Sequence, residues 1–337
     1  MSVYKTGHRL MIPDGAVAAT LRRFSSLLGL ALMCLALSLA SEHFLTVDNL
    51  MNVFRQSAVN ALLGLGQLAV IVTAGIDLSV GSILGFCCVL VALMLKAGAP
   101  AWIAIPAALA AGTALGAING LLLTRLRLPH PFIPTLGMMN VARGLALVIS
   151  GGFAISELPA SFRFWGAGTV ARIPVPILVV VLFCVLFHLF LTRTTPGRDI
   201  FAIGGNKQAA LLSGVPVDRR LDMVYGMSGF MSAVAAIVLA GRMNSGFPLA
   251  GMGAELDSIA AVIIGGASFF GGVGGVGGTL VGALIIGVLR NGLNLLDVSA
   301  YWQTVIIGAV IVMAVWVDVL RQRAAARGKR PSVPPPR

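Results

Sequence analysis

Nine polar side chains lie within long apolar stretches of this sequence, where a polar group is costly. Such residues usually face the interior of a helix bundle or a water-filled path. Five of the nine are neutral amides, so the set fits hydrogen bonding to an uncharged, hydroxylated solute better than ion or proton transport. The same amides could instead join neighbouring helices to one another. The nine are Gln67, Asp77, Asn119, Asn140, Arg143, Asp257, Arg290, Asn291 and Asn294.

Asp77 lies in the stretch TAGIDLSVGS, between two apolar runs. Aspartate is a preferred N-cap, and Ser79 offers a second capping hydroxyl, so the pattern predicts a helix that begins at Leu78. Asp257 stands in a similar position in the second half of the chain. Alternatively, paired helix breaks in the two halves of a transporter mark the path of the solute. We favour capping for Asp77, and a cap at a helix break can also line a path.

Arg143 is the nearest obvious cation for Asp77 within the apolar runs. It follows Asn140 by three residues, so the two side chains share a face if the segment is helical. The candidate partners of Arg143 are the carboxylate of Asp77 and the carbonyl groups at a helix C-terminus.

The sequence lacks the motifs of the common hydrolases and nucleotide-binding enzymes. It contains no Walker A motif, no HExxH and no GxSxG. Its four histidines are scattered, and its four cysteines lie in apolar runs without the spacing of a metal site. We therefore predict that the chain is not an enzyme and holds no cofactor or metal of its own.

The elements that position these residues are predicted to be membrane-spanning helices. Of the 337 residues, 58% are hydrophobic and only 11% are charged, whereas a soluble domain has about 25% charged residues. Several runs of roughly 17–22 residues are nearly free of charge, the length that crosses a bilayer as a helix. An all-α membrane protein with about ten spans is predicted, at 24–41, 57–75, 80–96, 101–123, 133–150, 175–191, 222–241, 256–271, 275–294 and 302–320.

The distribution of Lys and Arg orients these spans. The net charge of +12 could indicate a nucleic-acid partner, but the basic residues gather in a few short loops and at both ends. Most of them lie on one side if both termini are cytoplasmic. The predicted organisation is a cytoplasmic segment 1–23, a transmembrane domain 24–320 with a cytoplasmic loop 192–221, and a basic, proline-rich, disordered tail 321–337. A cleaved signal peptide is the disfavoured alternative for the first span.

A short pattern recurs in the two halves of the chain. Gly112-Thr113-x-x-Gly116-Ala117 reappears as Gly278-Thr279-x-x-Gly282-Ala283. Upstream of each copy stands one of the two aspartates, and in the predicted topology these start spans of opposite direction. The pattern indicates an inverted repeat of five plus five spans, a plan common among transporters.

The loop 192–221 contains a predicted docking element. Pro196-Gly197 and Gly204-Gly205-Asn206 are turn signals. The segment QAALLSG then predicts a short helix that starts at Gln208 and is stopped by Gly214. Its apolar residues on an exposed loop favour contact with a partner protein, although a solvated connector is the alternative.

This loop resembles the coupling loop of ABC importer permeases, whose signature is Glu-Ala-Ala, three residues, then Gly. The chain has Gln208-Ala209-Ala210, three residues and Gly214. TAGIDLSVGSILG, PFIPTLGMMNVARG, GRDIFAIGGN and ELDSIAAVIIGGASFFGGVGG are similar to segments of the ribose-type sugar permeases. The resemblance covers residues 45 to 320. Gln208 in place of glutamate, together with His130 and Pro134 near the start of the fifth span, departs from the family pattern.

The resemblance implies a membrane subunit of a sugar importer in the bacterial inner membrane. Two permease copies would form the channel, two ATPase domains on a separate polypeptide would bind ATP and Mg, and a periplasmic binding protein would deliver a ribose-like pentose or related sugar. The implied coupling residues are Gly205, Asn206, Gln208, Ala209, Ala210 and Gly214. The path or helix-break residues would be Asp77, Ser79, Asn119, Asn140, Arg143, Asp257, Asn291 and Asn294. The competing functions are a stand-alone carrier or channel and a membrane scaffold.

Overall fold

The computed structural model describes residues 14–328, which are mostly helical. The apolar runs form helices because a helix satisfies its own backbone hydrogen bonds within the segment. The helices are α1 (Asp14–Ala40), α2 (Val47–Val72), α3 (Val80–Lys96), α4 (Ala101–Arg125), α5 (Phe132–Ser150), α6 (Ala160–Ala167), α7 (Val175–Arg193), α8 (Thr195–Gly205), α9 (Lys207–Leu212), α10 (Val217–Met243), α11 (Ala254–Ile264), α12 (Val276–Leu295) and α13 (Ala300–Gly328).

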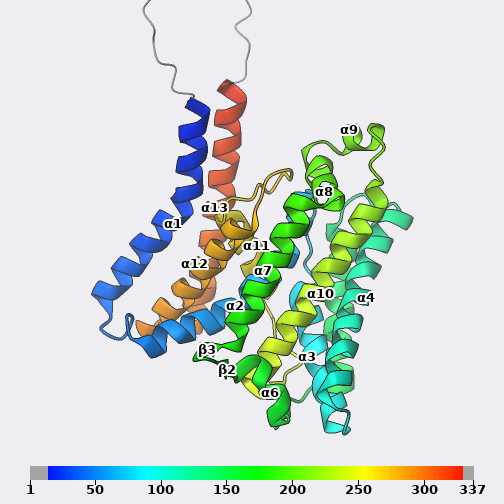
Figure 1. The fold of residues 1–337 in the computed structure, drawn as a ribbon, viewed down its shortest axis with the longest axis vertical. Helices are drawn as coiled ribbons and strands as arrows, with labels where there is room; N and C mark the ends of the chain where they lie inside the picture. Colours follow the sequence, from blue (N-terminus) through cyan, green and yellow to red (C-terminus); the bar gives the residue numbers. More distant parts are fainter. Residues whose placement is uncertain (1–13, 329–337) are drawn as a thin grey trace, which may run out of the picture.

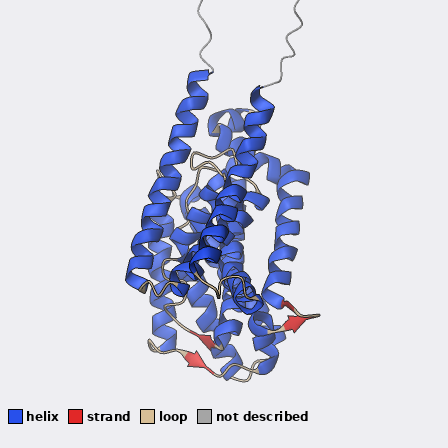
Figure 2. Ribbon diagram, turned by 90° about the vertical axis from the view of Figure 1, so that its left-hand side faces the viewer, coloured by secondary structure: helices blue, strands red, loops and turns tan. Residues whose placement is uncertain are grey.

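Four two-residue strands complete the described part. β1 (Ile155–Ser156) pairs antiparallel with β4 (Ser245–Gly246), and β2 (Thr169–Val170) pairs antiparallel with β3 (Ile173–Pro174). The strands lie at the end of the molecule opposite α8 and α9 (Figures 1 and 2). The first described residues of α1 and the last of α13 lie at the α8–α9 end (Figure 1). Both described ends of the chain are therefore on the same side of the helix bundle.

The core of the bundle is built around α2, α3 and α10. The side chains along α2 from Ala61 onward and along most of α10 are buried. Close helix contact is made through glycines, since a Cβ on Gly112 or Gly116 of α4 would collide with backbone atoms of α10 near Gly229. Helices α5, α7 and α13 instead expose many large apolar side chains, as expected for surfaces in contact with lipid.

Each of the ten predicted spans overlaps a helix, but six described helices are both long and apolar enough to cross a membrane: α4, α5, α7, α10, α12 and α13. Residues Ser26–Ala40 and α3 are shorter apolar helices. The predicted span 256–271 is wrong in its extent, because α11 ends at Ile264. At 1.5 Å per residue its 11 residues extend about 16 Å, too short for a hydrocarbon core of about 30 Å. The fold is a mostly helical, multi-pass membrane protein.

Glycines explain why α11 is short. Gly266, Gly271 and Gly272 have φ values of +94°, +86° and +72°, a backbone conformation that ends a helix and favours glycine.

The two chain ends also differ from expectation where they are described. Helix α1 begins at Asp14, inside the predicted N-terminal segment 1–23. Helix α13 continues to Gly328, so the disorder predicted for 321–337 is wrong for residues 321–328. Residues 1–13 and 329–337 lie outside the described residues.

Candidate functional site

Asp77 lies fully buried in the break between α2 and α3. Its Oδ1 accepts hydrogen bonds from the backbone N–H of Ser79 at 2.9 Å and from the Ser79 hydroxyl at 2.6 Å. Its Oδ2 accepts from the hydroxyl of Ser228 on α10 at 2.7 Å. Helix α3 begins at Val80, so the prediction of a helix starting at Leu78 was wrong by two residues. Asp77 therefore organises the turn before α3 and ties that turn to α10.

Two buried amides extend this network. The side chain of Gln67, taken in the orientation that satisfies both groups, donates to the carbonyl oxygen of Asp77 and accepts from its N–H, each at 3.2 Å. Asn119 of α4 donates from Nδ2 to the Ser79 hydroxyl at 2.9 Å. Gln67, Asp77, Ser79 and Asn119 are all fully buried. The arrangement joins α2, α4 and α10 around the break. Gln67 and Asn119 therefore join neighbouring helices, which was one of the two roles considered for the amides.

Substitution of Asp77 separates this structural role from a role in the solute path. Asp77→Ala leaves the Ser79 N–H, the Ser79 hydroxyl and the Ser228 hydroxyl without their acceptor, at about 1–3 kcal/mol for each buried group that stays unpaired. We expect loss of folded protein, measured as monodisperse yield in detergent. Asp77→Asn keeps an acceptor oxygen and is expected to retain much of the transport activity. An Asp77→Asn variant that assembles normally but takes up no solute would contradict the structural role.

Arg143 contacts carbonyl groups and does not pair with Asp77. Its Nη1 donates to the carbonyl oxygens of Pro248 at 2.6 Å and Ala250 at 2.9 Å, in the loop between α10 and α11. The predicted neighbour Asn140 is exposed and bonds the Leu136 carbonyl of its own helix at 3.0 Å. These two residues therefore belong to a different region from the network of Asp77.

Asp257 forms an ion pair that the sequence did not reveal. Its Oδ2 lies 2.7 Å from Nη2 of Arg290, which joins α11 to α12. The two residues are 33 positions apart, and only the packing of α11 on α12 brings them together. Asp257 and Arg290 were both among the nine polar residues in apolar runs. Their opposite charges were the feature of the sequence that could have predicted the ion pair.

The remaining predicted amides also bond between elements. Asn291 of α12 exchanges two hydrogen bonds with Asn49 of α2, at 2.8 and 3.1 Å. Asn294 accepts from Nε2 of Gln303 on α13 at 2.7 Å. Asn49 and Gln303 were missed because one precedes and the other barely enters a predicted span. The polar set is thus divided among several separate contacts and does not line one common path in this structure.

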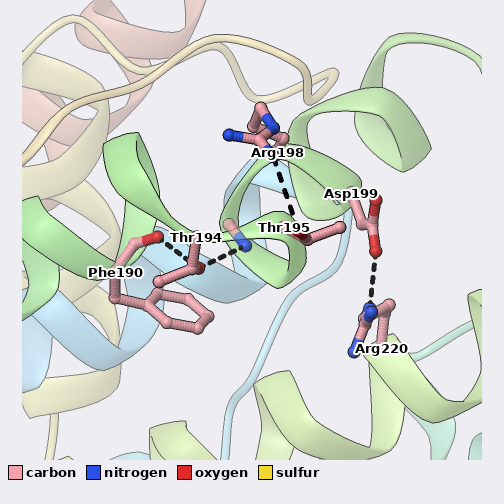
Figure 3. A network of polar contacts seen from close by, with 7 residues as sticks. Phe190, Thr194, Thr195, Arg198, Asp199 and Arg220 are labelled. Carbon is pink, nitrogen blue, oxygen red and sulfur yellow. Dashed lines mark hydrogen bonds and ion pairs between the residues drawn. The ribbon is translucent and has the colours of Figure 1, made fainter.

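The predicted docking element forms a corner of two helices, α8 and α9. Thr194 caps α8, since its hydroxyl oxygen accepts from the Gly197 N–H at 3.0 Å and donates to the Phe190 carbonyl at 2.7 Å (Figure 3). An ion pair of 2.7 Å between Asp199 and Arg220 fastens α8 to the start of α10 (Figure 3). Helix α8 is therefore held to both α7 and α10.

Helix α9 has a buried side and an exposed side. Ala210 packs with Ile203 of α8 and with Val217 and Leu221 of α10, whereas Gln208 and Ala209 are exposed. Two leucines point outward, with Leu211 57% and Leu212 87% exposed. Of the predicted coupling residues, Ala210 supports the helix from behind and is not available for contact with a partner.

The ends of α9 follow the sequence pattern. The side chain of Asn206 accepts from the Ala209 N–H at 2.9 Å, so Asn206 is the N-cap. Gly214 has a φ of +82°, which only glycine adopts readily, and it follows the C-cap residue Ser213. The short helix predicted from Gln208 to Gly214 is confirmed as α9.

The corner also contacts the helix that leads to Asp77. The backbone N–H of Gly272 donates to the Val72 carbonyl at the end of α2 at 2.9 Å. Gly204 of α8 packs against both groups so closely that a Cβ there would collide with them. The neighbouring Gly205 has open space around it. At Gly204, helix α8, the α11–α12 loop and the end of α2 thus meet through backbone atoms.

Comparison with known proteins gives a consistent result. Residues 49–315 match the family model described as branched-chain amino acid transport system / permease component. The ribose import permease protein RbsC of Bacillus subtilis (strain 168) is 44% identical over 300 residues, which is 88% of this chain and 93% of that protein. The D-allose transport system permease protein AlsC of Escherichia coli (strain K12) is 42% identical over 284 residues, 84% of this chain and 87% of that protein.

A third relative is more distant. The L-arabinose transport system permease protein AraH of Escherichia coli (strain K12) is 34% identical over 302 residues, covering 90% of this chain and 92% of that protein. No solved structure matches the chain. The family model and all three permeases match along most of the chain, and this extent of similarity establishes the family. The chain therefore belongs to this family of transport permeases, together with the ribose, D-allose and L-arabinose permeases.

Proposed function

We propose that the chain is the permease subunit of an ABC importer that moves a monosaccharide, a ribose-like pentose or a related sugar, across the bacterial inner membrane. The observation that supports this most strongly is identity of 34–44% to import permeases named for three monosaccharides, along most of the chain. Asp77 and Asp257, the two carboxylates predicted for the path, are held by hydrogen bonds and by an ion pair, which disfavours an ion-driven carrier. In this proposal the energy for transport comes from ATP hydrolysis by a partner subunit.

A separate ATPase subunit, which binds ATP and Mg, is proposed to dock on the α8–α9 corner. Support comes from the exposed Leu211 and Leu212 on α9, whose Ala210 packs against α8 and α10. A periplasmic sugar-binding protein would approach the opposite end, where the four short strands lie (Figure 2). A second copy of the permease would complete the channel within the lipid.

We further propose that both termini are cytoplasmic and that the chain has ten membrane-embedded helices in an inverted five-plus-five arrangement. In support, the described ends of α1 and α13 lie on the α8–α9 side (Figure 1). Both copies of the repeated glycine pattern make close helix contacts, Gly116 with Gly229 and Gly282 with Ala261. In this arrangement α11 enters the membrane but is too short to cross it by itself.

Reconstitution in proteoliposomes tests the proposed function. With the ATPase, the binding protein and ATP all present, we expect uptake of one of D-ribose, D-allose or L-arabinose, and with any of the three components omitted we expect none. Uptake by the purified permease alone would instead support a stand-alone carrier or channel. Absence of uptake of all three sugars by the complete system would contradict the proposed substrate class.

A further inference from the structure

A non-helical segment, residues 244–253, connects α10 to α11 and runs beside α3. The contact is close: a Cβ on Gly246 would collide with Cys88, one on Gly85 with the Ala250 carbonyl, and one on Gly81 with the Gly251 carbonyl. The segment therefore runs antiparallel to most of an apolar helix. At membrane depth, backbone without regular structure is tolerated only where it is buried in protein or lines a water-filled cavity.

Arg143 holds this segment and has donors left over. One nitrogen, Nη1, binds both the Pro248 and Ala250 carbonyls. A guanidinium has five N–H donors, and Nε and Nη2 of Arg143 make no hydrogen bond to the described residues. The side chain is partly exposed, so these donors are available to a solute.

Glu255, in the first turn of α11, faces this arginine. Its carboxylate interacts electrostatically with Arg143, but no nitrogen of Arg143 lies within the 4.0 Å of an ion pair. Its Oε2 is buried, lies against Gly81 and has no hydrogen-bond partner among the described residues by geometry, although the backbone N–H groups of Gly253 and Glu255 are close enough to stabilise the carboxylate. Buried polar atoms are rarely left unpaired, so an unpaired one indicates a missing water, ion or ligand.

The ion pair between Asp257 and Arg290 contrasts with the separation of Arg143 and Glu255. Asp257, two residues further along α11, contacts Arg290 at 2.7 Å and needs no further partner. Arg143 of α5 and Glu255 of α11 also have opposite charges, yet they do not form an ion pair. A group inserted between them has to accept a hydrogen bond from the guanidinium and donate one to the carboxylate.

We propose that Arg143 and Glu255 form a subsite for a hydroxyl group of the transported sugar, on the path beside residues 244–253. This inference rests on the proposed function as a sugar permease. A hydroxyl both donates and accepts, so it satisfies the two charged groups at once, and hydrogen bonds to charged groups are the stronger kind. A carboxylate or ammonium solute would satisfy only one of the two groups.

The test compares uptake of a transported sugar with that of its deoxy analogues, each lacking one hydroxyl, by the complete importer in proteoliposomes. In the wild type, removal of the bound hydroxyl is expected to slow uptake about tenfold, the effect of losing one charge-assisted hydrogen bond. Glu255→Gln is expected to slow uptake of the parent sugar by a similar factor. In that variant, the ratio of parent uptake to critical-analogue uptake should fall, because a neutral amide replaces the charge-assisted hydrogen bond to the hydroxyl.

Matched controls separate recognition from folding. Asp257→Asn changes the neighbouring carboxylate and should leave the ratio of parent to analogue at its wild-type value, whatever it does to the amount of folded protein. Arg143→Lys keeps the positive charge but removes the Nε and Nη2 donors, and should reduce the same ratio. The binding protein is common to all variants, so its own preference cancels in the comparison.

Two outcomes would overturn the subsite. One is an equal loss for parent and every analogue in Glu255→Gln, which means a structural role only. The other is unchanged uptake of the parent sugar in that variant. Failure of the wild-type complex to transport any of the three named sugars would instead count against the proposed function, so the two failures are distinguishable.

Discussion

Replacing Gly204 with alanine is expected to prevent stable assembly of the helix bundle. The new methyl group would overlap the Val72 carbonyl and the Gly272 N–H, which are backbone atoms already hydrogen-bonded to each other. No flexible side chain can move aside, so the cost should reach or exceed the upper end of the usual range for overpacking, about 3 kcal/mol. The measurement is the thermal unfolding midpoint of the full chain in detergent, together with the yield of monodisperse protein.

Gly205 provides the matched control for this prediction. It is the next residue in the same helix, and an added methyl group would meet nothing within 4 Å. Gly205→Ala should therefore unfold at the wild-type temperature or slightly above it, because alanine favours the helix more than glycine. Equal stability of the two variants would show that α8 does not meet α2 and the α11–α12 loop as closely as described.

Replacing Leu212 with aspartate is expected to abolish ATP-driven uptake while leaving the permease folded. Leu212 is 87% exposed on α9 and contributes little to the folded chain itself. In a docked complex the same side chain would be buried, and a charge there would lose the apolar contact and add an unpaired buried carboxylate, at several kcal/mol. The measurements are co-purification of the ATPase subunit and sugar uptake in proteoliposomes, with the unfolding midpoint as a check on folding.

Leu212→Met is the control, because methionine keeps an apolar side chain of similar size. It should retain most of the ATPase binding and uptake of the wild type. Full uptake by Leu212→Asp, or equal losses in both variants, would show that the exposed face of α9 is not the docking surface.

Local patterns in the sequence predicted much of the fold. The apolar runs placed ten helices, and the turn signals around Asn206 and Gly214 placed α9 within one residue at its start. These features depend on neighbours only a few positions apart, such as the N-cap bond from Asn206 to the Ala209 N–H. The extent of α11 was misjudged because an apolar, glycine-rich run has the same hydropathy whether it is a helix or a loop.

The partners of the polar residues could not be predicted in the same way. Asp77 was expected to cap the next helix, but one of its oxygens binds Ser228, 151 positions away. Arg143 was a candidate partner for Asp77 and instead binds two carbonyl groups of the α10–α11 loop. A side chain in an apolar run needs some partner, and the sequence alone does not state which helix will supply it.

The sequence by itself determined that the chain is a helical membrane protein, that its loop 192–221 contains a short helix, and which of its polar residues lie within apolar runs. It did so because hydropathy, charge and turn chemistry act over short stretches of chain. Only the tertiary structure decided which polar groups meet: it closed the pair of Asp257 and Arg290 and left Arg143 and Glu255 apart. Those contacts depend on how glycine faces allow helices and loops to approach each other, which is a property of the packed bundle.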